Sequence, residues 1–137
     1  MTAEKAFPLI RHLTGEYAIP QGSTWRQAFR IRYRDDDADP WTYWPSSDYT
    51  GVMTVRNELD GPVLLVCSTA NGRLTLGQQG TDPNIYTILI SCSATVTGSD
   101  TLDALDYGYY DIKVTSPFGH VTTVYKGRIS LERQVGE

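Results

Sequence analysis

The stretch "YYDIKVTSPFGHVTTVYKGRISLE", residues 109–132, decides the fold class. In its first half Tyr110, Ile112 and Val114 alternate with polar residues, which is the two-residue period of a half-buried strand. "SPFG", residues 116–119, follows with Ser, Pro and Gly where a type I turn favours them. We therefore expect a β-hairpin, with a bulge or bend where Gly127 interrupts the return strand. The alternation predicts one shared face for Val121, Thr123, Tyr125, Ile129 and Leu131.

The same strand period recurs outward from this hairpin. In "TWRQAFRIRYR", residues 24–34, the apolar side chains fall on one face and four Arg on the other. Further strands are expected over residues 51–57, 63–69, 74–76 and 84–93. Because the apolar residues of "VLLVCST", residues 63–69, fall on both parities, we expect both faces of that strand to be covered.

Turn signals separate these strands. Asn71-Gly72 predicts a tight turn with positive φ, and Leu102 and Leu105, three apart, predict one helical turn ending near Tyr107. About seven short strands with turns roughly every ten residues predict an all-β sandwich. Residues 1–15 match neither period, so we expect an N-terminal arm that orders only against a neighbour.

Length and charge narrow the function classes. The chain has 137 residues, which suggests one domain, and a formal net charge of −4. A duplex-binding protein is normally strongly basic, so we expect no nucleic-acid partner. No segment approaches the ~18–20 consecutive apolar residues of a membrane span, and the N-terminus does not resemble a secretory signal. We therefore expect no membrane insertion and a compartment that keeps thiols reduced.

Cys67 and Cys92 are the two cysteines, and each lies in an apolar strand. The pattern favours two buried free thiols. A disulfide is possible if the two strands face each other, which the sequence does not decide. Neither cysteine has His or Cys neighbours at metal-ligand spacing, so we expect no metal site here.

No catalytic motif stands out. His12 and His120 lie apart, no Ser or Cys sits in a nucleophile motif, and His120 follows a turn in the manner of a solvated residue. The run Asp35, Asp36, Asp37 and Asp39 lacks the Gly and Glu of a calcium loop, which favours a solvated turn. We expect no enzyme activity, no cofactor and no metal.

The segment "WTYWPSSDY", residues 41–49, has the most unusual composition of the chain. It contains Trp41, Tyr43, Trp44 and Tyr49 beside a Pro, which favours a loop over a regular strand. Such rings stack on sugar faces, anchor protein interfaces, or close one end of a sandwich. The sequence leaves these three readings open.

The Arg residues at 26, 30, 32 and 34 form a ladder of like charges along one strand face. Such a ladder is tolerated where water, nearby acids or a partner compensates it. An exposed solvated face, an acidic protein partner and a nucleic acid are the three readings, with the nucleic acid opposed by the net charge of −4.

Four blocks together resemble a known family. They are "YAIPQGSTWRQAFRIR" (17–32), "SSDYTGVMTVR" (46–56), "ANGRLTLG" (70–77) and "YGYYDIKVTSPFGHVTTVYKGRISL" (107–131). In order and spacing they are similar to phage tail and baseplate proteins that resemble the N-terminal domain of the baseplate upper protein. The second block departs from the family pattern, because Gly51 is displaced. Residues 33–45 lie outside the blocks.

The resemblance implies an immunoglobulin-like antiparallel β-sandwich over residues 16–137, with residues 1–15 as the arm. It also implies a non-enzymatic structural component of a phage tail tip, baseplate or fibre attachment. The expected partners are other virion proteins in a homo- or hetero-oligomeric assembly, formed in the host cytoplasm and present in the virion.

We expect the binding surface to lie in the aromatic loop and the Arg ladder. The residues are Trp41, Tyr43, Trp44, Arg30, Arg32 and Arg34. The alternative function is a carbohydrate-binding module that contacts host surface glycans, and a small hydrolase is a third class.

Overall fold

A computed structural model describes residues 2–3, 8–34, 38, 42–45, 48–77 and 87–133. The strands expected from the sequence are present. They are β4 (Trp25–Phe29), β7 (Thr50–Arg56), β8 (Val63–Ser68), β9 (Leu74–Leu76), β10 (Ile88–Cys92), β11 (Tyr107–Thr115) and β12 (Val121–Glu132). Short segments add to them, namely β1 (Thr2–Ala3), β2 (Leu9–Ile10), β3 (Ile19–Pro20), β5 (Arg32–Arg34) and β6 (Thr42–Tyr43).

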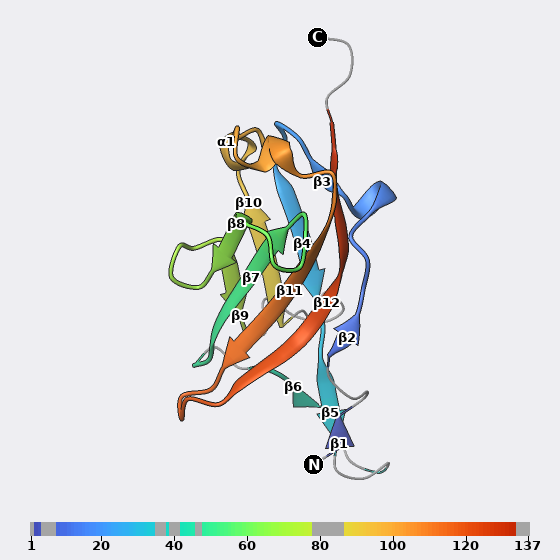
Figure 1. Cartoon of the computed structure of the whole chain (residues 1–137). Helices are drawn as coiled ribbons and strands as arrows, with labels where there is room; N and C mark the ends of the chain where they lie inside the picture. Colours follow the sequence, from blue (N-terminus) through green and yellow to red (C-terminus); the bar gives the residue numbers. More distant parts are fainter. Residues whose placement is uncertain are drawn as a thin grey trace.

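Two sheets stack to form the sandwich (Figure 1). The larger has the order β2-β12-β11-β7-β8, with β3 also paired to β12, and the smaller has the order β4-β10-β9. In immunoglobulin notation β4, β9 and β10 take the places of strands B, D and E, and β7, β8, β11 and β12 those of C, C′, F and G. The expected all-β, immunoglobulin-like sandwich is therefore confirmed.

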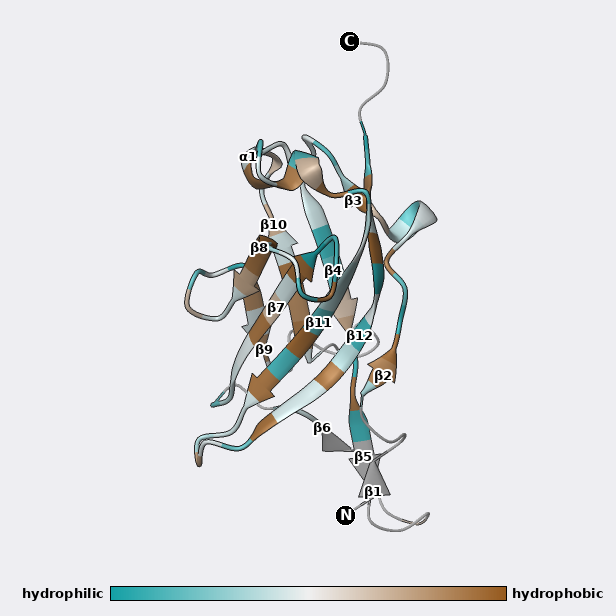
Figure 2. Cartoon of the chain, viewed as in Figure 1, coloured by the Kyte–Doolittle hydropathy of each residue, from teal (hydrophilic) through white to brown (hydrophobic). Residues whose placement is uncertain are grey.

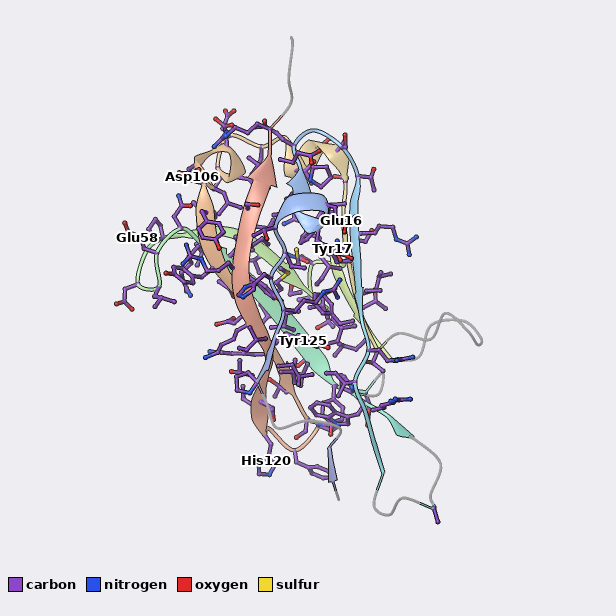
Figure 3. The ribbon with its side chains drawn as sticks, turned by 90° about the vertical axis from the view of Figure 1, so that its right-hand side faces the viewer. Glu16, Tyr17, Glu58, Asp106, His120 and Tyr125 are labelled. Atoms are coloured by element: carbon purple, nitrogen blue, oxygen red, sulfur yellow. The ribbon has the colours of Figure 1, made fainter. Side chains whose placement is uncertain are left out.

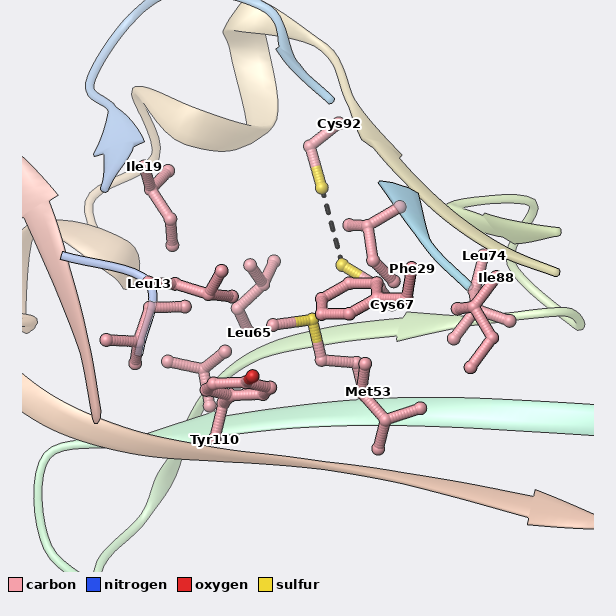
Figure 4. Packing of buried hydrophobic residues seen from close by; sticks show 14 of the residues in the cluster. Leu13, Ile19, Phe29, Met53, Leu65, Cys67, Leu74, Ile88, Cys92 and Tyr110 are labelled. Carbon is pink, nitrogen blue, oxygen red and sulfur yellow. Dashed lines mark hydrogen bonds between the residues drawn. The ribbon is translucent and has the colours of Figure 1, made fainter. Parts of the chain in front are cut away.

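The core lies between the two sheets (Figure 4). Its fully buried members include Phe29 from β4, Met53 from β7, Ile88 from β10 and Ile112 from β11. Figure 2 shows hydrophobic and hydrophilic residues alternating along β11, as the two-residue period requires. Along β7 and β11 every second residue is therefore left on the outer face.

The hairpin of β11 and β12 differs from expectation in one place. The turn is as predicted, with the Gly119 N–H donating to the Ser116 carbonyl at 3.0 Å. The bulge, however, lies at Val124, because Ile112 pairs with Tyr125 while Lys113 pairs with Thr123. Val124 is fully buried, and the predicted shared face fails at Val121, which is 63% exposed.

Gly127 has another role than the predicted bulge. It pairs in regular register with Tyr110. A Cβ at this position would overlap the backbone carbonyl of Arg11. Glycine is therefore needed because another backbone segment crosses β12 here.

That segment is residues 8–14, part of the N-terminal arm expected from the sequence. It runs beside β12, with the Leu13 N–H donating to the Arg128 carbonyl at 2.8 Å and the Ser130 N–H to the Leu13 carbonyl at 3.2 Å. Leu13 is 0% exposed and belongs to the core. Residues 9–13 thus lie against the sandwich itself, and the domain begins before residue 16.

Smaller elements close the ends. Gly72 has φ +78°, as the predicted tight turn requires. A 3₁₀ turn over Leu102–Ala104 buries Leu102 and Leu105 completely, and a short α1 (Ala94–Thr97) precedes it. On β8 Leu65 and Cys67 are buried on the inner face, while Val66 on the outer face is 37% exposed. The register shift beside Val55 pairs Val63 with the outward-facing Arg56, and Val63 is 39% exposed. The expectation that both faces of this strand are covered is wrong.

Candidate binding surface

The aromatic loop is described in part. Trp41 lies outside the described residues, and of Tyr43 the structure gives the backbone, in β6, paired with Arg32 of β5. Trp44 is half-buried against the core and meets the Tyr49 ring edge-on, with centroids 5.5 Å apart and an interplanar angle of 83°. For Trp44 this geometry matches the closure of one end of the sandwich, one of the three readings of its loop.

The Arg ladder is divided between β4, in the smaller sheet of the sandwich, and β5, which belongs to a separate three-stranded sheet with the order β1-β5-β6. Its apolar face is as predicted, because Trp25, Phe29 and Ile31 are buried. Arg26 and Arg30 are exposed, Arg32 is half-buried, and the Arg34 side chain lies outside the description. β4 pairs with β10, whereas β5 pairs with β1 and β6, so the strand changes partners near residue 31. The Arg residues therefore do not share one sheet face.

A groove of about 360 Å³ lies on the outer face of the larger sheet. β7, β11 and β12 form its floor, while the β2 segment and the loop between β7 and β8 form its walls. The wall residues Ile10 and Leu59 are 59% and 70% exposed. The floor carries Thr54, Arg56, Tyr109, Asp111, Lys126 and Arg128.

Strand register explains this floor. Tyr109 pairs with Arg56 on one side and with Arg128 on the other, so these three residues form one row across the sheet. Asp111, two residues on, pairs with Thr54 and Lys126 and forms the next row. Since paired residues point to the same side, both rows face outward.

Arg128 is held firmly in this surface. Its guanidinium lies over the rings of Tyr107 and Tyr109, at 3.9 and 4.1 Å from their centroids. It donates to the Gly108 carbonyl at 3.1 Å, to the Tyr109 hydroxyl at 2.9 Å and to the Tyr107 carbonyl at 2.7 Å. The stacking and the hydrogen bonds together fix the plane of the guanidinium. We call Tyr107, Tyr109 and Arg128 the Tyr–Arg clamp.

His12 belongs to the wall of this groove. Its Nδ1 accepts the backbone N–H of Arg128 at 3.0 Å, so this nitrogen carries no proton in the arrangement described. The bond ties the N-terminal segment to β12. His12 therefore holds the N-terminal wall of the groove against β12, which forms part of the floor.

The tip of the hairpin between β11 and β12 also exposes an apolar side chain. This residue is Phe118, which is 89% exposed. The Ser116 Oγ accepts the backbone N–H groups of Phe118 and His120 at 3.2 and 3.1 Å, so the turn is held by its own side chain. Figure 3 places His120 at this tip, while Glu16 and Asp106 lie toward the opposite end.

The two cysteines face each other across the core (Figure 4). Their Sγ atoms are 3.3 Å apart, and both thiols are buried and free. The hydrogen bond with Cys92, together with burial, raises the pKa of the Cys67 thiol. The same hydrogen bond lowers the pKa of Cys92.

Sequence reasoning missed the groove. Its floor residues are the polar half of the strand alternation, which is also the pattern of any solvated face. A signal was present in Tyr107, Tyr109 and Arg128, an aromatic pair and a cation on neighbouring predicted strands. These residues can be combined into one site only if the pairing of the two strands is known, and the bulge at Val124 shifts that pairing.

No family model matches the chain, and no curated protein does. The solved structure of murine CRIg is similar over 96% of this chain and 98% of that chain, at 12% identity and a TM-score of 0.33. A structural similarity with so low a TM-score supports no inference about function. Within the described ranges no helix is long and apolar enough to cross a membrane. Those same ranges hold no cluster of three or more His, Cys, Asp or Glu that fits a metal ion.

Proposed function

We propose that the protein is a non-enzymatic structural subunit that works through protein–protein contacts at the groove of the larger sheet. The observation that carries this proposal is the composition of the groove. Ile10 and Leu59 leave apolar walls exposed to water, and two members of the Tyr–Arg clamp, Tyr109 and Arg128, lie on the floor. A partner that covers the groove gains the burial of these walls.

Tyr and Arg are also the residue types enriched where protein interfaces concentrate their binding energy. The clamp is held in place before any partner arrives, because Arg128 donates to three acceptors of its own chain. A pre-ordered side chain loses little rotamer entropy on binding. Asp111 and Lys126, also on the floor, add one negative and one positive side chain for polar contacts with a partner.

We propose more specifically that this subunit is part of a bacteriophage tail or baseplate, with other virion proteins as partners. The order of the four sequence blocks over residues 17–131 supports this assignment. A virion part of this kind is assembled in the host cytoplasm and then stays in the particle. The sandwich also has sheet edges at β2 and β8, and such edges accept neighbouring strands in multi-subunit assemblies.

A carbohydrate-binding module is the second candidate. Tyr107, 55% exposed at the rim of the clamp, is the ring that favours it, because sugars stack on exposed aromatic faces. Binding on a glycan array that is lost in Tyr107→Ala would support this candidate over the structural subunit.

The test replaces Leu59, whose side chain is 70% exposed, by Asp. Val121→Asp is the matched control. Val121 is also exposed, at 63%, but it is the first residue of β12 and lies outside the groove. Mass spectrometry of purified particles measures how much of each variant is incorporated. We expect the natural chain and the control in the particles, and loss of Leu59→Asp. Incorporation of both variants, or loss of both, would contradict the role of the groove. Absence of the natural chain from particles would contradict the virion role.

A further inference from the structure

The strongest feature outside the groove is the pair of cysteines in the core. Cys67 lies in β8 of the larger sheet, opposite Met53, and Cys92 ends β10 of the smaller sheet, opposite Trp25. The two Sγ atoms are 3.3 Å apart, and the exposed fractions are 0% and 1%. The pair therefore joins the two layers of the sandwich at one point (Figure 4).

The backbone already holds the two thiols close to bonding position. An S–S bond measures about 2.05 Å, so the sulfur atoms need to approach by roughly 1.2 Å. Small rotations about the two Cα–Cβ bonds supply movements of that size, and the strands stay in register. The bond would close a loop between residues 25 apart in sequence.

We propose that Cys67 and Cys92 are a disulfide site that links the two sheets and stabilises the fold once the chain meets a disulfide oxidant such as oxidised glutathione. This link joins positions C′ and E of the sandwich, not the B and F positions of the usual immunoglobulin disulfide. The proposal does not depend on the function proposed above.

The reaction balances as two exchanges. The Cys92 thiol gives its proton to solvent, and its thiolate attacks the oxidant, so that one S–S bond breaks, a mixed disulfide forms and one glutathione leaves as thiolate. The Cys67 thiol then loses its proton, attacks Sγ of Cys92, and expels the second glutathione. The protein loses two electrons and two protons, and the oxidant gains both.

Burial decides when this reaction takes place. Neither sulfur is open to a bulky oxidant in the folded chain, since the exposed fractions are 0% and 1%. The exchange therefore proceeds during folding or through transient opening of the β8 edge. The same burial protects the finished bond from reductants, as in other structural disulfides.

The experiment refolds the full chain with a mixture of reduced and oxidised glutathione, and in parallel with a reductant. Both samples are then alkylated in denaturant and weighed by mass spectrometry. We expect two alkyl groups on the reduced chain, and on the oxidised chain no alkyl groups and a mass lower by two hydrogens. The melting temperature of the oxidised chain should be higher by at least about 5 °C.

Cys67→Ala and Cys92→Ala serve as controls, and each should show equal melting temperatures with and without oxidant. If either variant fails to fold, the comparison of oxidised and reduced natural chain still decides. Two alkyl groups after oxidative refolding, bonds formed between chains only, or a melting temperature lowered by oxidation would each overturn the proposal.

Discussion

The two faces of the larger sheet are built by the same strands but carry different properties. On the inner face Met53, Val55, Ile112 and Val114 are each 0% exposed. On the outer face, one residue away along the same strands, Thr54, Arg56, Tyr109 and Asp111 line an open groove. Of two neighbouring positions on one strand, one therefore stabilises the fold and the other forms the groove. Substitutions at adjacent residues should therefore have unrelated effects.

The largest expected effect tests the inner face. Ile112→Ala removes a fully buried side chain between Met53 of β7 and Tyr125 of β12. We expect the free energy of unfolding to fall by about 2–5 kcal/mol, from lost burial and the cavity left behind. Urea denaturation with unchanged slope measures it.

Asp111→Ala is the control for this substitution, because it changes the adjacent residue of the same strand on the outer face. We expect a change within about 0.5 kcal/mol there. Equal losses of stability at both positions would contradict the separate roles of the two faces.

The next effect tests how the N-terminal segment is attached. Gly127→Ala adds a Cβ that overlaps the Arg11 carbonyl, so residues 9–13 must move off β12. We expect a loss of about 1–3 kcal/mol, the usual size for overpacking. Hydrogen exchange should show faster exchange of the Arg11 and Leu13 amides. Lys126→Ala, at the exposed neighbour, should leave both amides protected.

The buried face of the larger sheet shows what the sequence can predict. The inner face of β11 was predicted residue by residue, because burial on alternate positions is a local signal carried by Tyr110, Ile112 and Val114. The class of fold followed from repeating that signal along the chain, and the strand order bears it out.

The missed features are non-local. Gly127 interrupts the alternation of β12 in the sequence, and the reason that glycine is needed there lies at Arg11, more than a hundred residues earlier. Leu13 carries no sequence signal of burial, because residues 8–14 have no strand period of their own and pair with β12 through only a few parallel hydrogen bonds. The groove likewise depends on register across three strands. Of the predicted site residues, Trp41 lies outside the described residues, so its assignment stays a prediction.

A smaller effect concerns Tyr110, which connects the inner face to the N-terminal segment. Its hydroxyl donates to the Arg11 carbonyl at 2.6 Å, and burial raises the pKa of this phenol. Tyr110→Phe loses this hydrogen bond, which costs about 1 kcal/mol at neutral pH.

The contribution of Tyr110 to stability should also depend on pH. Because the folded state holds the proton more tightly than the unfolded state, the contribution of Tyr110 is complete below about pH 10 and is lost as pH rises further. Urea denaturation between neutral pH and pH 11 should show the natural chain losing stability faster than Tyr110→Phe above pH 10. A constant difference between the two would contradict the pKa shift.

The smallest expected effect on stability belongs to the outer face. Arg128→Lys keeps the positive charge but loses the planar fork that reaches Tyr107, Gly108 and Tyr109 together. Because the clamp faces water, we expect a loss of only about 0.5–1 kcal/mol in urea denaturation. Arg26→Lys, on the exposed side of β4, should change stability less. Incorporation into particles should fall for Arg128→Lys and stay normal for Arg26→Lys, since the ordered guanidinium is what the groove offers a partner. A loss of stability as large as that of Ile112→Ala would instead make the clamp part of the fold, and the two faces would no longer be separable.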